Sequence, residues 1–120
     1  MAGLQVQIFG LESDKSTRAA IRFFKERRIA IHLVDLRRKP IAAGELRRFV
    51  ERLGAQALAD RTGKAWREAG LGYLRMTDAE LAERLLADTR LLLLPLVRFG
   101  NAVSAGRDEA TWKAWLSAGA

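Results

Sequence analysis

A cluster of short polar side chains holds the residue types in this sequence that are best suited to chemistry. Four such residues stand at the start of a segment with helical periodicity: Ser13, Asp14, Ser16 and Thr17. A side-chain oxygen at this place accepts a hydrogen bond from a free backbone N–H at a helix start, so Ser13 or Asp14 is the predicted cap. Hydroxyl and N–H groups at a helix start can also bind an anion, which is the second interpretation of this cluster.

The residue types that are missing exclude several kinds of reaction. The chain of 120 residues contains no cysteine, so it forms no disulfide and has no thiol nucleophile of its own. His32 is the single histidine, and no serine or carboxylate stands beside it as a catalytic partner. We therefore predict a surface or edge-strand histidine and not a general base. One histidine without cysteine also gives no metal site, and we expect no cofactor.

The elements that must position these residues follow from hydrophobic periodicity. The predicted strands are residues 4–9, 31–35, 96–99 and 102–104, with Gly100-Asn101 as the turn between the last two. The predicted helices are residues 16–28, 43–53, about 64–68, about 77–87 behind a Thr77 capping box, and a last one from about Asp108. We expect Trp112, Trp115 and Leu116 to point inward from the last helix.

The order of these elements predicts an α/β fold. Strand, helix and strand open the chain, and the crossover helix implies that the two strands are parallel. A β-hairpin and a helix close it. This is the order of a thioredoxin-like fold, a mixed four-stranded sheet built as β-α-β and then β-hairpin-α, with a helical insertion in the middle. We expect one domain over residues 1–120, with its core at about 1–40 and 90–120 and the insertion at about 41–89.

Three segments resemble the arsenate reductase (ArsC)/Spx family, in its small Spx-like branch. The family's strand, Phe-Gly pair, redox loop and first helix resemble the segment IFGLESDKSTRAAIRFF. Its Leu-x-x-Arg stretch followed by Trp-Arg is similar to LADRTGKAWREAGL. Its apolar run, proline, strand, hairpin and Gly-Arg pair resemble LLLLPLVRFGNAVSAGR. The resemblance covers almost the whole chain and implies a cis peptide bond before Pro95.

The resemblance also shows which enzymatic residues are missing. The family's catalytic cysteine falls on Asp14, and two of the three arginines of its oxyanion pocket fall on Arg61 and Arg107. The third arginine, directly before Pro95, is Leu94 here. The carboxylate of Asp14 would repel arsenate by about 4 kcal/mol at ~4 Å and an effective dielectric constant of ~20. We therefore expect no arsenate reduction and no simple anion binding at this position.

Two interpretations of Asp14 stay open. In one, Asp14 only caps the helix. In the other, its carboxylate replaces the charge of the lost thiolate and pairs with Arg107 or Arg18. Such a pair would close the former site, whereas an open cleft around Asp14, Arg61 and Arg107 would favour binding of a small ligand.

The net charge of +7 favours acidic partners without identifying one. The densest basic region contains Arg37, Arg38, Lys39, Arg47, Arg48 and Arg52. It has no interleaved aromatic residues, and the chain has no DNA-reading motif, so a solvated face is favoured over protein docking and nucleic-acid binding.

The retained scaffold without its nucleophile predicts a catalytically silent protein, a pseudoenzyme, that acts by binding another macromolecule. The Spx resemblance implies a role in transcription, with the C-terminal domain of the RNA polymerase α subunit as partner. The alternative is binding of glutathione or an oxyanion, or a non-thiol reaction, at the former reductase site. The chain has no run of ~18 apolar residues and no signal peptide, so we expect no membrane span and a cytoplasmic location.

Overall fold

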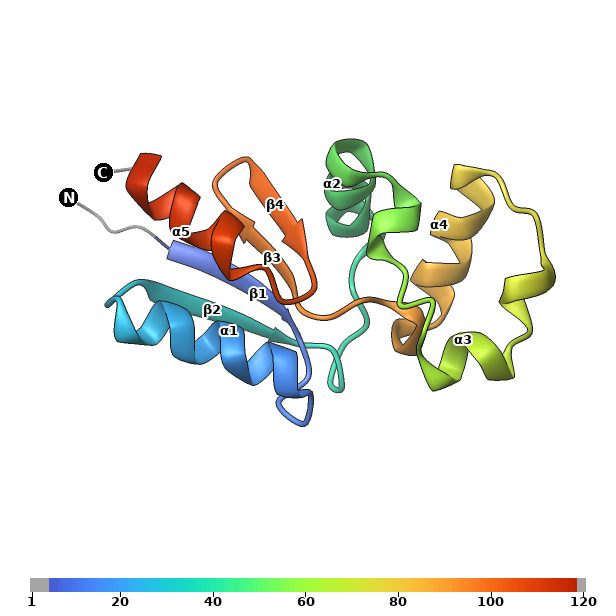
Figure 1. The fold of residues 1–120 in the computed structure, drawn as a ribbon, viewed down its shortest axis with the longest axis horizontal. Helices are drawn as coiled ribbons and strands as arrows, with labels where there is room; N and C mark the ends of the chain where they lie inside the picture. The colour runs from blue at the N-terminus through green and yellow to red at the C-terminus, as the bar shows by residue number, and fades with distance from the viewer. Residues whose placement is uncertain (1–4, 119–120) are drawn as a thin grey trace. The chain divides into compact units, whose positions relative to one another are not determined.

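The computed structural model describes residues 5–118, which form two compact units. The sheet unit contains the two ends of the chain, up to Lys39 and from Leu94 onward. The helical unit contains Pro40–Leu93. Figure 1 shows the strands in blue, teal and orange, near the two ends of the chain, and a run of helices in its green and yellow middle.

The sheet unit contains a mixed four-stranded sheet in the order β2-β1-β3-β4. Its strands are β1 (Gln5–Gly10), β2 (Ala30–Asp35), β3 (Leu96–Phe99) and β4 (Ala102–Ala105). Strand β1 pairs parallel with β2 and antiparallel with β3, and β3 pairs antiparallel with β4. The predicted α/β, thioredoxin-like fold class is thereby confirmed. Leu4, which we placed in the first strand, lies outside the described residues.

Helices α1 (Lys15–Glu26) and α5 (Glu109–Ala118) bury their apolar residues together with those of the sheet. The ring of Trp112 lies 5.4 Å from that of Phe23 and 5.5 Å from that of Phe24, measured between centroids. The Trp112 indole N–H donates to Ser104 Oγ at 2.9 Å. Trp115 is half-buried and stacks on Phe99, so the inward orientation predicted for this helix is confirmed.

Helix α1 ends two residues before the predicted end at Arg28. The backbone of Arg28 adopts the left-handed conformation, with φ of 58°, and a right-handed α-helix cannot continue through such a residue. The N–H of Ile29 then bonds back to the Phe24 carbonyl, so the chain turns into β2. The prediction was wrong because no glycine marks this left-handed residue.

The helical unit contains α2 (Ala43–Leu53), α3 (Lys64–Glu68) and α4 (Asp78–Ala87). Between and after them lie three 3-10 turns, η1 (Ala55–Leu58), η2 (Leu71–Tyr73) and η3 (Thr89–Leu91). Gly54 ends α2 with φ of 81°, and Thr77 and Glu80 form the predicted capping box of α4. Among the described residues, no helix has the length and apolar character needed to cross a membrane.

Candidate functional site

The strand register brings three loops to one end of the sheet. Phe9 pairs with Leu96, and Leu96 pairs with Ala105. The residues just beyond these pairs are the loop after Gly10, the Leu94–Pro95 bond and Gly106-Arg107. The Gly106 N–H donates to the Pro95 carbonyl at 2.9 Å, which fixes the third loop against the second. Except for Arg61, all predicted site residues therefore lie at this end of the sheet unit.

Asp14 caps helix α1. Its Oδ2 accepts from the backbone N–H of Thr17 at 2.8 Å and from the Thr17 hydroxyl at 2.7 Å. Thr17 is fully buried, while Asp14 is half-buried. A Cβ placed on Gly10 would lie 2.7 Å from Thr17 Cγ2, so the Phe-Gly pair leaves the space that Thr17 occupies. The carboxylate is thus held by the two hydrogen bonds that a helix N-cap normally forms.

The same arrangement recurs at the start of α5. Asp108 Oδ1 accepts from the Thr111 N–H at 3.2 Å, and Asp108 Oδ2 accepts from the Thr111 hydroxyl at 2.7 Å. Both helices therefore begin with Asp-x-x-Thr and with the same two hydrogen bonds. Since nothing in the sequence gives Asp108 a chemical role, this repetition favours the capping interpretation of Asp14.

The ion pair that would have closed the former site is not formed. Arg107 Nη2 lies 2.7 Å from Glu109 Oε2, and this arginine also donates from Nε to the same oxygen. Arg18 donates to the Glu12 backbone carbonyl at 2.9 Å. The hypothesis that Asp14 pairs with Arg107 or Arg18 is wrong, because each of these arginines takes an acceptor close to it in the chain.

The remaining residues of the predicted site do not complete an anion pocket in the sheet unit. The Leu94–Pro95 peptide bond is cis, as the resemblance implied, and Pro95 is buried. Leu94 supplies no charge, Arg107 shares its charge with Glu109, and Asp14 adds a negative one. Ser13 is exposed and Ser16 is half-buried, without a hydrogen bond from either side chain to another described residue.

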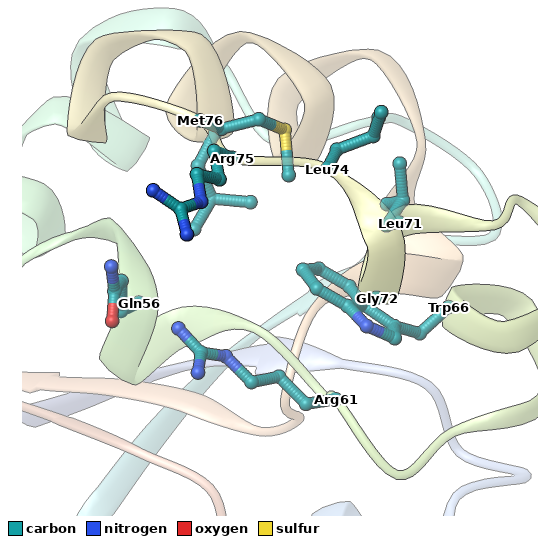
Figure 2. A pocket seen from close by; sticks show the side chains of 9 residues that line it. Gln56, Arg61, Trp66, Leu71, Gly72, Leu74, Arg75 and Met76 are labelled. Atoms are coloured by element: carbon teal, nitrogen blue, oxygen red, sulfur yellow. The ribbon is translucent and has the colours of Figure 1, made fainter.

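Arg61 belongs to the helical unit and lines a cavity there. The cavity measures about 480 Å³ and is lined entirely by residues between Gln56 and Leu81. Figure 2 shows the Arg61 and Arg75 side chains extending toward the same open space, with Trp66 at another part of its wall. Sequence reasoning missed Arg75 as a companion of Arg61, although the Trp-Arg stretch had pointed to this part of the chain.

The other candidates behave as surface residues. His32 is exposed on the edge strand β2, where its Nδ1 lies 3.2 Å from Gln7 Nε2, and the prediction of an edge-strand histidine is confirmed. The six residues of the basic region are all exposed, three in each unit. Over residues 5–118, no group of three or more histidine, aspartate or glutamate side chains could hold a metal ion.

The family model described as the ArsC family matches residues 9–115. No curated protein sequence matches the chain. Among solved structures, the YffB protein has a TM-score of 0.83 at 20% identity, covering 91% of this chain and 96% of its own.

Two further structures are similar in the same way. An ArsC family related protein from Bacteroides fragilis has a TM-score of 0.83 at 17% identity, covering 93% of this chain and 98% of its own. An arsenate reductase from Vibrio cholerae has a TM-score of 0.79 at 18% identity, covering 91% of this chain and 95% of its own. At these identities the likeness concerns the fold.

Proposed function

This chain belongs to the ArsC family, and from that premise we propose that it is a member without thiol chemistry that acts by binding another macromolecule. The observation that carries the proposal is the role of Asp14. The position that the resemblance gives to the nucleophile holds a carboxylate whose Oδ2 accepts two hydrogen bonds from Thr17. The chain contains no cysteine at any other position either. It therefore has a capped helix start at this place but no thiol of its own that could react.

The surface of the helical unit supports a protein as the bound macromolecule. Tyr73 is 95% exposed and the adjoining Leu74 is 47% exposed. Large apolar side chains that are exposed next to one another are typical of protein–protein contact surfaces. Tyrosine is among the residue types that contribute most to binding energy. Three arginines on α2 are exposed in the same unit and favour a partner with acidic groups: Arg47, Arg48 and Arg52.

The identity of the partner is proposed from the Spx resemblance alone. It gives the C-terminal domain of the RNA polymerase α subunit as the first protein to test, and with it a role in transcription. A redox switch of the kind that needs cysteine is excluded for this chain by its composition.

The alternative, binding of glutathione or an oxyanion at the former reductase site, has less support. Arg107 shares its charge with Glu109 at 2.7 Å, and Leu94 replaces the arginine that the resemblance would require. Asp14 would in addition repel an anion. We therefore do not propose this function for the sheet unit.

The test is a pull-down from nuclease-treated native lysate, with the full chain as bait and mass spectrometry as the readout. We expect a stoichiometric protein partner, with the RNA polymerase α subunit as the first candidate. The double variant Tyr73→Ser/Leu74→Ser should lose this partner. Glu83→Ser/Arg84→Ser is the matched control, since it changes two exposed residues of the same unit and keeps the net charge.

Three results would argue against the proposal. The bait could retain no protein in stoichiometric amount, or retain one that the Tyr73→Ser/Leu74→Ser variant holds equally well. A protein that is retained from untreated lysate but not from the nuclease-treated one would instead identify nucleic acid as the ligand. Circular dichroism and thermal unfolding of both variants establish that they are folded.

A further inference from the structure

The cavity of the helical unit has the size and lining of a small-molecule site. Its volume of about 480 Å³ falls within the range that ligand pockets occupy, roughly 300–1,000 Å³. Five apolar side chains contribute to its wall: Trp66, Leu71, Leu74, Met76 and Leu81. Its polar side chains are Gln56 and two arginines, Arg61 and Arg75.

Both arginines lack an acceptor within the described part of the chain. Neither Arg61 nor Arg75 forms an ion pair or a side-chain hydrogen bond with another residue of 5–118. No aspartate or glutamate lines the cavity. In Figure 2 the two guanidinium groups approach the open space from separate segments, beside the Gln56 amide. Two positive charges thus face one cavity without a protein counter-charge.

Trp66 adds a third donor without an acceptor. Its side chain is buried at 8% exposure, yet the indole N–H donates to no acceptor among the described residues. A tryptophan this deeply buried usually has a hydrogen-bond partner for its N–H. No fully buried side-chain nitrogen in the described residues lacks a partner, so this N–H keeps contact with open space. The cavity therefore presents donors on several sides and an aromatic wall.

These features define the kind of ligand that would fit the cavity. A carboxylate or phosphate has only acceptors and forms paired hydrogen bonds with the planar guanidinium fork. The rings and methylenes of Trp66, Leu71 and Met76 favour an apolar body attached to that anion. We propose that this cavity binds a small organic anion, a carboxylate or phosphate monoester that carries an aromatic or apolar group.

Gly72 provides an independent way to block the cavity. A Cβ built at this lining residue meets only Trp66 Nε1 within 4 Å, at 3.9 Å, which is ordinary van der Waals contact. A Cβ at this position is thus accommodated without a clash. A larger side chain would occupy space beside Trp66 while leaving both arginines in place.

The test follows the three tryptophan indole N–H signals of the ¹⁵N-labelled full chain by NMR, with phenyl phosphate and benzoate as probes. We expect one indole signal, assigned to Trp66 by its absence in Trp66→Phe, to shift and saturate. Phenyl phosphate and benzoate distinguish the phosphate class from the carboxylate class. Inorganic phosphate and benzyl alcohol each lack one half of the recognised structure, so we expect them to bind at least about tenfold more weakly.

Variants separate this site from general charge effects. Arg61→Gln and Arg75→Gln should each weaken probe binding by about tenfold or more, because each removes a charge-assisted hydrogen bond. Gly72→Leu should weaken it without changing the charge. Arg84→Gln, an exposed arginine on α4 outside the cavity, is the matched control and should bind as the wild type does.

The proposal is overturned if neither aromatic anion shifts the Trp66 signal saturably, or if Arg61→Gln and Arg75→Gln bind no more weakly than Arg84→Gln. Equal binding of benzyl alcohol would also overturn it, since an anion would then not be recognised. The tryptophan signals of each folded variant report its structure in the same spectra. Arg61→Gln and Arg75→Gln change the cavity and leave Tyr73 and Leu74 unchanged, so a pull-down with these two variants separates the docking surface from the cavity, which Leu74 also lines.

Discussion

At the scale of single residues, the position that the resemblance gives to the nucleophile is an ordinary helix start. Two carboxylates, Asp14 and Asp108, each accept a backbone N–H and a hydroxyl from the threonine three residues later. An N-cap contributes about 1 kcal/mol to the free energy of unfolding. The contacts of Asp14 are therefore those of a helix cap.

The capping role predicts equal losses of stability for two variants. Asp14→Ala and Asp108→Ala should each lower the free energy of unfolding by about 1 kcal/mol, because each removes the acceptor for one helix start. Urea denaturation followed by circular dichroism measures both. A loss well above ~2 kcal/mol for Asp14→Ala alone would indicate a further role for its charge, and no loss would contradict the cap itself.

The helix start should still activate a thiol placed on it. In Asp14→Cys, the N–H and hydroxyl of Thr17 and the positive end of the α1 dipole favour the thiolate. We expect the thiol pKa to lie below its ordinary value of about 8.5. The rate of alkylation by iodoacetamide as a function of pH measures it without ambiguity, because the variant contains one cysteine. An ordinary pKa would show that the scaffold has lost this property too.

At the scale of elements, periodicity and capping chemistry predicted most of the secondary structure. Helix α2 has the predicted bounds of 43–53, and the hairpin turns at Gly100 as expected. The end of α1 was missed because Arg28 adopts a left-handed conformation that the sequence does not announce. The 3-10 turns were missed because three or four residues are too few to show a period.

The cavity could not be predicted either, because the residues that line it show no regular spacing in the sequence. Arg61, Trp66 and Arg75 have no common helical or strand spacing, and the irregular chain around η2 brings Arg75 to the cavity that Arg61 lines. The resemblance supplied Arg61 alone and assigned it to another site. The Asp14 cap, in contrast, depends on four consecutive residues and could be anticipated from the sequence.

The capping box of α4 gives a stability that depends on pH. The Thr77 backbone N–H donates to Glu80 Oε1 at 2.9 Å, and this bond, with that of the Thr77 side chain, lowers the pKa of Glu80. A lowered pKa stabilises the fold above the unfolded-state pKa, about 4.3, and this contribution is lost as the pH falls through the folded value. In Glu80→Gln the amide can still accept the hydrogen bond but cannot titrate.

We therefore expect the stability difference between the wild type and Glu80→Gln to be constant at neutral pH and to shrink below pH ~4. Urea denaturation at a series of pH values measures it. A difference that grows on acidification would contradict the sign of the pKa shift. Asp88, whose pKa is lowered by the Arg90 side chain at 2.8 Å, should change the stability of the wild type in the same direction.

At the scale of the whole molecule, the order of elements sufficed to predict the fold class. The crossover helix required parallel β1 and β2, and the short turn required antiparallel β3 and β4. The chain divides at Lys39 and Leu93, with the cap and the sheet in one unit and the cavity and exposed Tyr73 in the other. The features that support binding are thus concentrated in the helical insertion.

The net charge of +7 predicts weak binding of nucleic acid without sequence preference. Fluorescence anisotropy with labelled duplex DNA should detect binding at low salt that falls steeply as salt rises and is lost near 200 mM. Binding that persists there and distinguishes one sequence from another would make nucleic acid the specific partner.

One measurement directly tests the proposal that this ArsC-family chain does not reduce arsenate. Arsenite production is followed with the purified full chain, arsenate, and glutathione as the only thiol. We expect the rate to equal that of the reaction without protein, because Asp14 is a helix cap and Leu94 offers no charge to the anion. Arsenite formed in proportion to protein concentration would contradict the account.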